Sequence, residues 1–262
     1  MTGHPLLDAE HAASARRNQP LRGLYNLRDT GGYPAASGAS RWGKLFRSDA
    51  LHRIDDAGRD RLSELGITRV IDLRGTEERQ SSPSALDGMD LTVYHLPVFD
   101  DAAPAAQAAG GVALAPVYDH MVDRRGRQLA AAIKTIADAP QDEAVLVHCT
   151  AGKDRTGIVV AFALSAAGVE RRAVVDDYAA SEKNLRGEWV DAMVSSFEQR
   201  GFTLTPDVLG LIAESPAPVI DALIDRVEKQ HGSVADYLLA HGLTGDDLTR
   251  LTAALVDTRT SA

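Results

Sequence analysis

The sequence contains a single cysteine, and the residues that follow it are spaced for anion chemistry. Cys149 is followed six positions later by Arg155, with Gly152 between them. A thiol can act as a nucleophile, and a guanidinium offers a planar fork to two oxygen atoms. A helix that begins near Thr156 adds free N–H groups and the positive end of its dipole. These residues predict a loop that holds a tetrahedral oxyanion above a thiol and favours the thiolate form.

Such a loop suits the cleavage of a phosphate monoester. That reaction needs an in-line nucleophile, donors for the equatorial oxygens and a proton for the leaving oxygen. We assign the first role to Cys149 and the second to Arg155 and the loop backbone. We expect His148 to orient the loop by a hydrogen bond to its backbone, not to act as a base. Two other uses of the loop stay open: phosphate binding without catalysis, and sulfur transfer through a cysteine persulfide.

The charged residues inside and near the loop allow more than one role. Lys153 could bind a second phosphate of the substrate, or it could point to solvent. Asp154 could turn outward and pair with a cation, or it could hold the proton for the leaving group. Asp72 competes for this acid role, because it ends a strand where open parallel sheets bind ligands. Asp100 and Asp101, after the next strand, are a third choice, and the sequence does not decide among them.

The loop lies between a strand and a helix that are both apolar enough to be buried. Short apolar runs predict strands at 44–48, 67–73, 91–98 and 143–148. Helical periodicity and capping residues predict helices at 55–66, at 117–139 with an interruption near Gly126, and from Thr156 to Gly168. Strands that alternate with helices imply parallel crossovers, so we expect an α/β fold with a mostly parallel central sheet flanked by helices.

The remainder of the chain is predicted to be helical. The expected helices are at 170–185, 188–200, 205–214, 218–230, 233–241 and 245–256. Those within 186–230 are amphipathic, follow the catalytic helix, and are expected to form a lid over the site. We expect 1–22 to be an arm and 23–262 a single domain that includes this lid. The segment 100–116 is rich in Ala, Gly and Pro and is expected to be a loop.

Composition narrows the classes of partner and compartment. The net charge of −9 argues against nucleic-acid binding, although a small basic pocket can exist on an acidic surface. The one cysteine excludes a disulfide within the chain. We find no apolar run long enough for a membrane span and no signal-peptide pattern, so we expect a cytoplasmic protein, with signal-less secretion as the alternative. No cofactor or metal is expected, because the histidines are scattered and HExxH is missing.

Four segments resemble one family. Residues 148–157, HCTAGKDRTG, resemble the HCxxGKDRTG loop of bacterial PtpB-like tyrosine phosphatases, dual-specificity enzymes that also act on phosphoinositides. Residues 26–33, NLRDTGGY, and 45–48, LFRS, are similar to two further motifs of that family. Residues 71–74, IDLR, with a following Glu77 or Glu78, are similar to a fourth. The resemblance covers about 24–185. For Arg28 and Arg47, within these motifs, surface salt bridges and a part in an anion pocket both stay open.

The resemblance implies a cysteine-dependent phosphatase fold, with Cys149 as nucleophile and Arg155 as phosphate clamp. It points to Lys153, Asp154 and Asp72 as further site residues. The lysine is shared with phosphoinositide phosphatases, so the implied substrates are phosphotyrosine, phosphoserine or phosphothreonine, and phosphoinositides. The oligomeric state stays open. The phosphate loop would comprise Thr150, Ala151, Gly152, Lys153, Asp154 and Arg155, with His148 and Thr156 in support.

Overall fold

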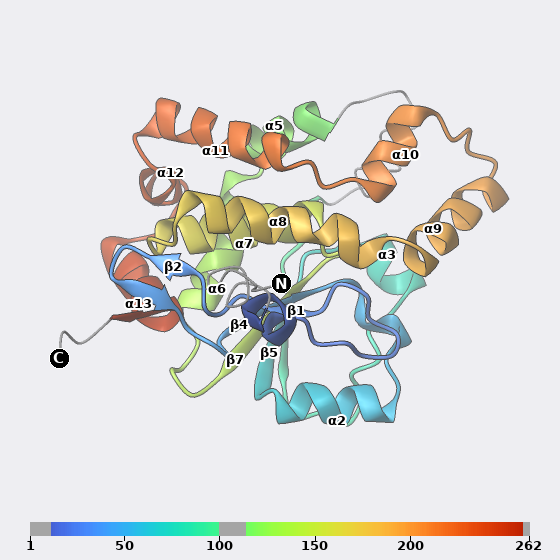
Figure 1. Cartoon of the computed structure of the whole chain (residues 1–262), viewed down its shortest axis with the longest axis horizontal. Helices are drawn as coiled ribbons and strands as arrows, with labels where there is room; N and C mark the ends of the chain where they lie inside the picture. Colours follow the sequence, from blue (N-terminus) through green and yellow to red (C-terminus); the bar gives the residue numbers. More distant parts are fainter. Residues whose placement is uncertain (1–11, 100–113, 259–262) are drawn as a thin grey trace, which may run out of the picture.

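A central sheet of five strands carries the loop at the carboxyl end of its middle strand. The computed structural model describes residues 12–99 and 114–258 (Figure 1). The strand order is β1-β4-β7-β5-β6; β4, β7, β5 and β6 run parallel and β1 is antiparallel. The expected α/β fold with a mostly parallel sheet is confirmed. The strands are β1 (Arg28–Asp29), β4 (Leu45–Ser48), β5 (Ile67–Asp72), β6 (Thr92–His95) and β7 (Ala144–His148).

The middle strand β7 is buried on both faces. Val145 and Val147 join the larger core cluster, whereas Leu146 joins a second cluster on the other side of the sheet. This division follows from the two-residue period of a strand, which turns alternate side chains to opposite faces. Apolar residues are therefore needed along β7 from Ala144 to Val147. The strand ends at His148, so Cys149 is the first residue beyond the sheet.

Helices cover the two faces unequally. Helix α2 (Asp56–Glu64) packs on the face that Leu146 joins, and the side chain of Asp55 caps its start by accepting the Gly58 N–H (Figure 1). The other face carries most of the helices, and their buried side chains form one core with Val145 and Val147. These are α5 (Leu114–Arg124), α6 (Gly126–Ala137), α7 (Asp154–Ala166), α8 (Arg171–Leu185), α11 (Ala217–His231), α12 (Val234–Ala240) and α13 (Gly245–Leu255).

The helix predicted at 117–139 is two helices, α5 and α6. The break falls at Gly126, where a Cβ atom would lie 2.2 Å from the His241 ring. Only a residue without a side chain allows α12 to pack this closely. Three further elements were not predicted from the sequence: the short η1 (Leu51–Arg53), α3 (Thr76–Ser81), and a small antiparallel sheet of β2 (Pro34–Ala35), β3 (Gly38–Ser40) and β8 (Val256–Thr258).

The segment predicted as a lid divides into two parts. Helices α9 (Glu188–Gln199) and α10 (Pro206–Ala213) project beyond the end of α8 and pack on each other (Figure 1). Helix α11 instead packs on α8, α12 and α5, and its apolar side chains belong to the main core. Of the predicted range, only α9 and α10 are thus placed apart from the core.

Two groups of predictions fall outside the described residues, namely those on 1–11 and on 100–113, which include Asp100 and Asp101. None of the helices in the described ranges has the length and apolar character needed to cross a membrane.

Candidate active site

The backbone of the loop between β7 and α7 requires a glycine at position 152. Gly152 has a φ of 65°, and a Cβ atom there would lie 2.1 Å from the carbonyl oxygen of Ser48. Glycine is therefore required both by conformation and by space. Helix α7 begins at Asp154, so the free N–H groups of its first turn face the same loop. The loop and the helix end together form a site for an anion.

Two side chains hold the loop from behind. The Asn26 amide donates to the carbonyl oxygens of Ala151 and Gly152 at 2.9 and 3.1 Å. The Arg47 guanidinium donates to the carbonyl of Gly152 at 2.8 Å and, more weakly, to that of Lys153 at 3.4 Å. Because these carbonyls are engaged at the back, the peptide N–H groups between them are turned toward the cavity. Residues from two of the family motifs thus shape the loop.

Arg28 and Arg47 lie neither on the surface nor in the anion pocket. Both are buried and share one carboxylate, Asp177 of α8, at 3.1 and 2.5 Å. Burial works against ionisation of Asp177, but the two arginines lower its pKa to about 2. The hydroxyl of Tyr33 also donates to Asp177. This network joins the edge of the sheet, α8 and the back of the loop.

Arg155 is held by a carboxylate from a helix that was not predicted. Its Nη1 and Nη2 atoms lie 2.6 and 2.9 Å from the two oxygens of Glu78 on α3. Glu78 also accepts the Thr150 hydroxyl. Burial opposes ionisation of Glu78, but the contact with Arg155 lowers its pKa. A guanidinium has five N–H donors, so this end-on pair leaves the Nε edge of Arg155 for a phosphate.

Lys153 does not point to solvent, which was one of the two expectations for it. Its side chain is 1% exposed, and its ammonium donates to the carbonyls of Leu211 and Glu214 at 2.9 and 2.7 Å. These carbonyls lie at the C-terminal end of α10. The ammonium is also 3.2 Å from Asp154 Oδ1. Lys153 therefore ties the loop to α10, and a contact with a second phosphate stays a prediction.

The expected acid residues lie in different surroundings. Asp154 lines the cavity and accepts a hydrogen bond from Tyr118 at 2.6 Å. Asp72 is buried and forms a bidentate ion pair with Arg74. Burial opposes ionisation of Asp72, but His148, charged at the low pH where Asp72 titrates, and Arg74 lower its pKa to about 2. Asp72 is thus a carboxylate at neutral pH, with no proton to give.

The structure adds a carboxyl group that sequence reasoning missed. Asp49 lines the same cavity, just beyond β4, and its Oδ1 accepts the N–H groups of Tyr25 and Asn26. Burial raises the pKa of Asp49 to about 6, against these hydrogen bonds. Its place directly after the LFRS motif, at the carboxyl end of a parallel strand, was the available signal.

The two supporting residues are fully buried. The His148 Nδ1 lies 3.2 Å from the carbonyl oxygen of Cys149, in agreement with an orienting contact to the loop. Burial lowers the pKa of His148 to about 4, so the ring is neutral at pH 7. The Thr156 hydroxyl is buried without a hydrogen-bond partner among the described residues. Neither side chain lines the cavity over Cys149.

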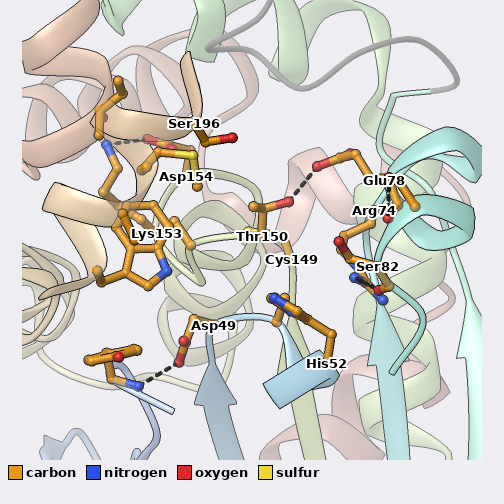
Figure 2. Close-up of a pocket in the computed structure, with 18 of the residues that line it drawn as sticks. Asp49, His52, Arg74, Glu78, Ser82, Cys149, Thr150, Lys153, Asp154 and Ser196 are labelled. Carbon is orange, nitrogen blue, oxygen red and sulfur yellow. Dashed lines mark hydrogen bonds and ion pairs between the residues drawn. The ribbon is translucent and has the colours of Figure 1, made fainter. Parts of the chain in front are cut away.

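A cavity of about 360 Å³ opens above Cys149. Figure 2 shows Glu78 and Arg74 on one side of Cys149, and Lys153 and Asp154 on the other. Apolar side chains of α9 and α10 line the far wall, among them Trp189, Phe197 and Ile212. In the part of the chain that the structure describes, no group of three or more His, Cys, Asp or Glu residues could hold a metal ion. The cavity thus joins a polar floor to an apolar wall.

Comparison with known proteins gives a consistent result. The model of the tyrosine phosphatase family matches residues 19–257. The triple specificity protein phosphatase PtpB of Mycobacterium tuberculosis is 31% identical over 90% of this chain and 98% of its own length. A tyrosine-protein phosphatase of Nostoc commune is 31% identical over 80% of this chain and 74% of its own. A relative from Cupriavidus necator is 28% identical over 89% of this chain and 87% of its own.

Proposed function

The chain belongs to the tyrosine phosphatase family, hydrolases of phosphoric monoesters, and on that premise we propose that it works through a phosphocysteine intermediate on Cys149. The observation that carries this proposal is the arrangement of Cys149 beneath a loop whose carbonyls are held back by Asn26 and Arg47. That arrangement directs peptide N–H groups toward a phosphoryl group placed over the sulfur.

The reaction has two steps in this proposal. In the first, the Cys149 thiolate attacks phosphorus, a P–S bond forms, and the ester P–O bond breaks. Asp154 gives its proton to the leaving oxygen. In the second, water attacks phosphorus, the P–S bond breaks, and the proton of the water goes to the Asp154 carboxylate. Inorganic phosphate leaves and the thiolate is restored, so atoms and charges balance.

Positive groups around the phosphoryl oxygens lower the barrier to both steps. Arg155 offers the donors that Glu78 does not use, and the first turn of α7 adds its free N–H groups. Burial lowers the pKa of Arg155, but Cys149, Glu78 and Asp154 raise it above its ordinary value. The guanidinium therefore stays protonated. Donors that are already oriented need no rearrangement as negative charge develops.

Asp154 is our choice for the acid because of its position. It begins α7 beside Arg155. The charges of Cys149 and of Asp154 both raise the pKa of Arg155, so both groups lie near its guanidinium. Asp72 is ion-paired away from the cavity. Asp49 also lines the cavity, but it lies beyond β4 and holds the backbone of Tyr25 and Asn26, whereas Asp154 belongs to the loop itself. With a poor leaving group, we expect Asp154→Asn to lose the alkaline limb of the pH–rate profile, and Asp49→Asn to keep it.

We propose phosphotyrosine as the main substrate, with phosphoserine, phosphothreonine and phosphoinositides as further ones. The apolar wall of α9 and α10, with Trp189 and Phe197, suits an aromatic ring. The name of the M. tuberculosis relative, a triple specificity phosphatase, supports the wider range. We further propose that the protein acts in the cytoplasm, with signal-less secretion as the alternative. An activity panel with these four substrate classes tests the range.

The Cys149→Ser variant tests the mechanism itself. We expect it to lose at least about a thousandfold in kcat with p-nitrophenyl phosphate, because an alcohol replaces the thiolate nucleophile. Circular dichroism should show that the variant stays folded. Full activity in this variant would contradict the proposal. A wild type that binds phosphopeptide without turnover would instead favour a binding module, and a persulfide after thiosulfate treatment would favour sulfur transfer.

A further inference from the structure

The two oxygens of the Asp154 carboxylate have unequal surroundings. Oδ1 lies 2.6 Å from the hydroxyl of Tyr118 and 3.2 Å from the ammonium of Lys153. Oδ2 has no hydrogen-bond partner among the described residues. Both donors thus act on one oxygen, and the other is left for a proton. An acid that serves a leaving group needs this division, because its proton must sit on the oxygen that faces the substrate.

Tyr118 belongs to a short chain of hydrogen bonds with a fixed direction. It lies on α5, and its hydroxyl is also 2.6 Å from that of Tyr178 on α8. An ionised carboxylate only accepts hydrogen bonds, so Tyr118 donates to Asp154 and Tyr178 donates to Tyr118. Burial, and then the charge of Asp154, raise the pKa of each tyrosine above its ordinary value. Neither tyrosine therefore supplies a proton near neutral pH.

Tyr118 is placed by packing, and among the described residues its hydroxyl forms hydrogen bonds only with Asp154 and Tyr178. It is 1% exposed, and its ring meets that of Tyr178 edge to face with centroids 6.2 Å apart. Tyr118 approaches from α5, whereas Lys153 reaches Asp154 from the loop and is itself held by α10. The tyrosine contact is therefore independent of the lysine contact. A residue of α5 and a residue of the loop thus contact the same oxygen, Oδ1 of Asp154.

Other charged groups surround this pair and must be considered for any pH dependence. Arg155 follows Asp154 on α7, and Cys149, Glu78 and Asp154 each raise its pKa. Arg47 from β4 and Glu182 from α8 act on the neighbouring Tyr178. Substitution of the Tyr118 hydroxyl changes none of these charges. A change in the pH–rate profile can then be assigned to the lost hydrogen bond.

We propose that Tyr118 is a positioning residue for Asp154, which holds Oδ1 so that Oδ2 carries the catalytic proton into the cavity. This inference rests on the proposed phosphocysteine mechanism and on Asp154 as its acid. Tyr118 also stabilises the ionised carboxylate, because a hydrogen bond to a charged group is stronger than one to a neutral group. Its removal has two effects: the charged form of the carboxylate loses a hydrogen bond, and the proton is less well directed toward the substrate.

The Tyr118→Phe variant tests this inference, with Tyr178→Phe as its matched control. Phenylalanine keeps the ring and removes only the hydroxyl, and the control leaves the Tyr118–Asp154 bond in place. Rates are measured against pH with p-nitrophenyl phosphate and with phenyl phosphate, whose leaving group needs a proton more. For Tyr118→Phe we expect kcat to fall about tenfold with phenyl phosphate and less than about threefold with p-nitrophenyl phosphate. The alkaline limb should rise by about one pH unit.

The outcomes separate a positioning role from a structural one. An equal loss with both substrates and an unmoved alkaline limb would overturn the inference, as would the same shift in Tyr178→Phe. If Asp154→Asn keeps the limb while Cys149→Ser is inactive, the inference fails and the phosphocysteine mechanism stands. Activity in Cys149→Ser contradicts the mechanism itself. If Tyr118→Phe does not fold, 3-fluorotyrosine at position 118 provides a stronger donor, and the limb must then move to lower pH.

Discussion

Arg155 shows how a single side chain is prepared for a ligand. Its guanidinium is held end-on by Glu78, which also accepts the hydroxyl of Thr150, the residue after Cys149. A flexible arginine would have to be ordered when substrate binds, at a cost in affinity. Here the ordering is done in advance by a residue of α3. Glu78 therefore belongs to the active site, although it never needs to touch the phosphate.

We predict that Glu78→Gln lowers kcat/KM for p-nitrophenyl phosphate by about tenfold, the equivalent of ~1.4 kcal/mol. The amide keeps the shape but can accept on only one atom and carries no charge, so the bidentate pair with Arg155 is lost. Steady-state kinetics provide the measurement. Glu64→Gln, exposed at the end of α2 and outside the cavity, is the control. Kinetics of Glu78→Gln equal to those of this control would show that Arg155 is ordered without Glu78.

At the scale of elements, α9 and α10 form a layer that is joined to the loop at one polar point and one apolar cluster. The apolar cluster includes Ala151 of the loop together with Trp189, Phe197 and Ile212. The polar point is Lys153, whose ammonium binds two carbonyls at the end of α10. A cation at a helix C-terminus is favoured by the helix dipole. Whether this layer moves as a lid stays a prediction. Its contacts with the loop are made by Lys153 and Ala151.

We predict that Lys153→Met loosens α10 while it keeps most of the side-chain stem. Each hydrogen bond from a charged donor contributes about 1.5–3 kcal/mol, so cleavage by trypsin after Arg200, between the two helices, should become at least about tenfold faster. Timed digestion followed by mass spectrometry measures this rate. Lys183→Met, an exposed site on α8, is the control. Equal digestion of the two variants would mean that Lys153 does not secure α10.

For the whole molecule, the network of Arg28, Arg47 and Asp177 joins regions far apart in the chain. It connects β1 and β4 to α8, and through Arg47 it reaches the loop. Two buried arginines share this one carboxylate, with Tyr33 as a further donor to it. A buried carboxylate so surrounded is strongly stabilised in its ionised form. Folding of the sheet edge, folding of α8 and shaping of the active site are therefore coupled.

We predict that Asp177→Asn lowers the free energy of unfolding by about 3–5 kcal/mol at pH 7, because it leaves two buried arginines without a counter-charge. The pKa of Asp177 is about 2 in the folded protein against 3.8 for an ordinary aspartate. Its contribution is therefore complete above pH 3.8 and is lost as the pH falls toward 2. The difference from wild type should shrink over that interval. Urea unfolding at several pH values measures it, with the exposed Asp176→Asn as control; a difference independent of pH would contradict the assignment.

The local features of this protein could be predicted from the sequence. The strand, loop and helix around Cys149 are contiguous, so their apolar pattern and glycine mark them as one unit, although Asn26 and Arg47 hold the loop from other parts of the chain. The helices after Gly168 were likewise predicted within a few residues, because periodicity and caps act over one or two turns. The small sheet was missed, because its strands are two or three residues long and β8 joins β3 from a distant part of the chain.

The partners of the charged residues were decided only by tertiary structure. Arg155 pairs with a residue 77 positions away, Lys153 with one 61 away, and Asp154 with one 36 away. No local pattern marks such pairs, since they depend on how crossover helices stack at one edge of the sheet. For the same reason the sequence left four candidate acids open. Burial and ion pairing, which separate Asp72 from Asp154, exist only once distant segments have come together.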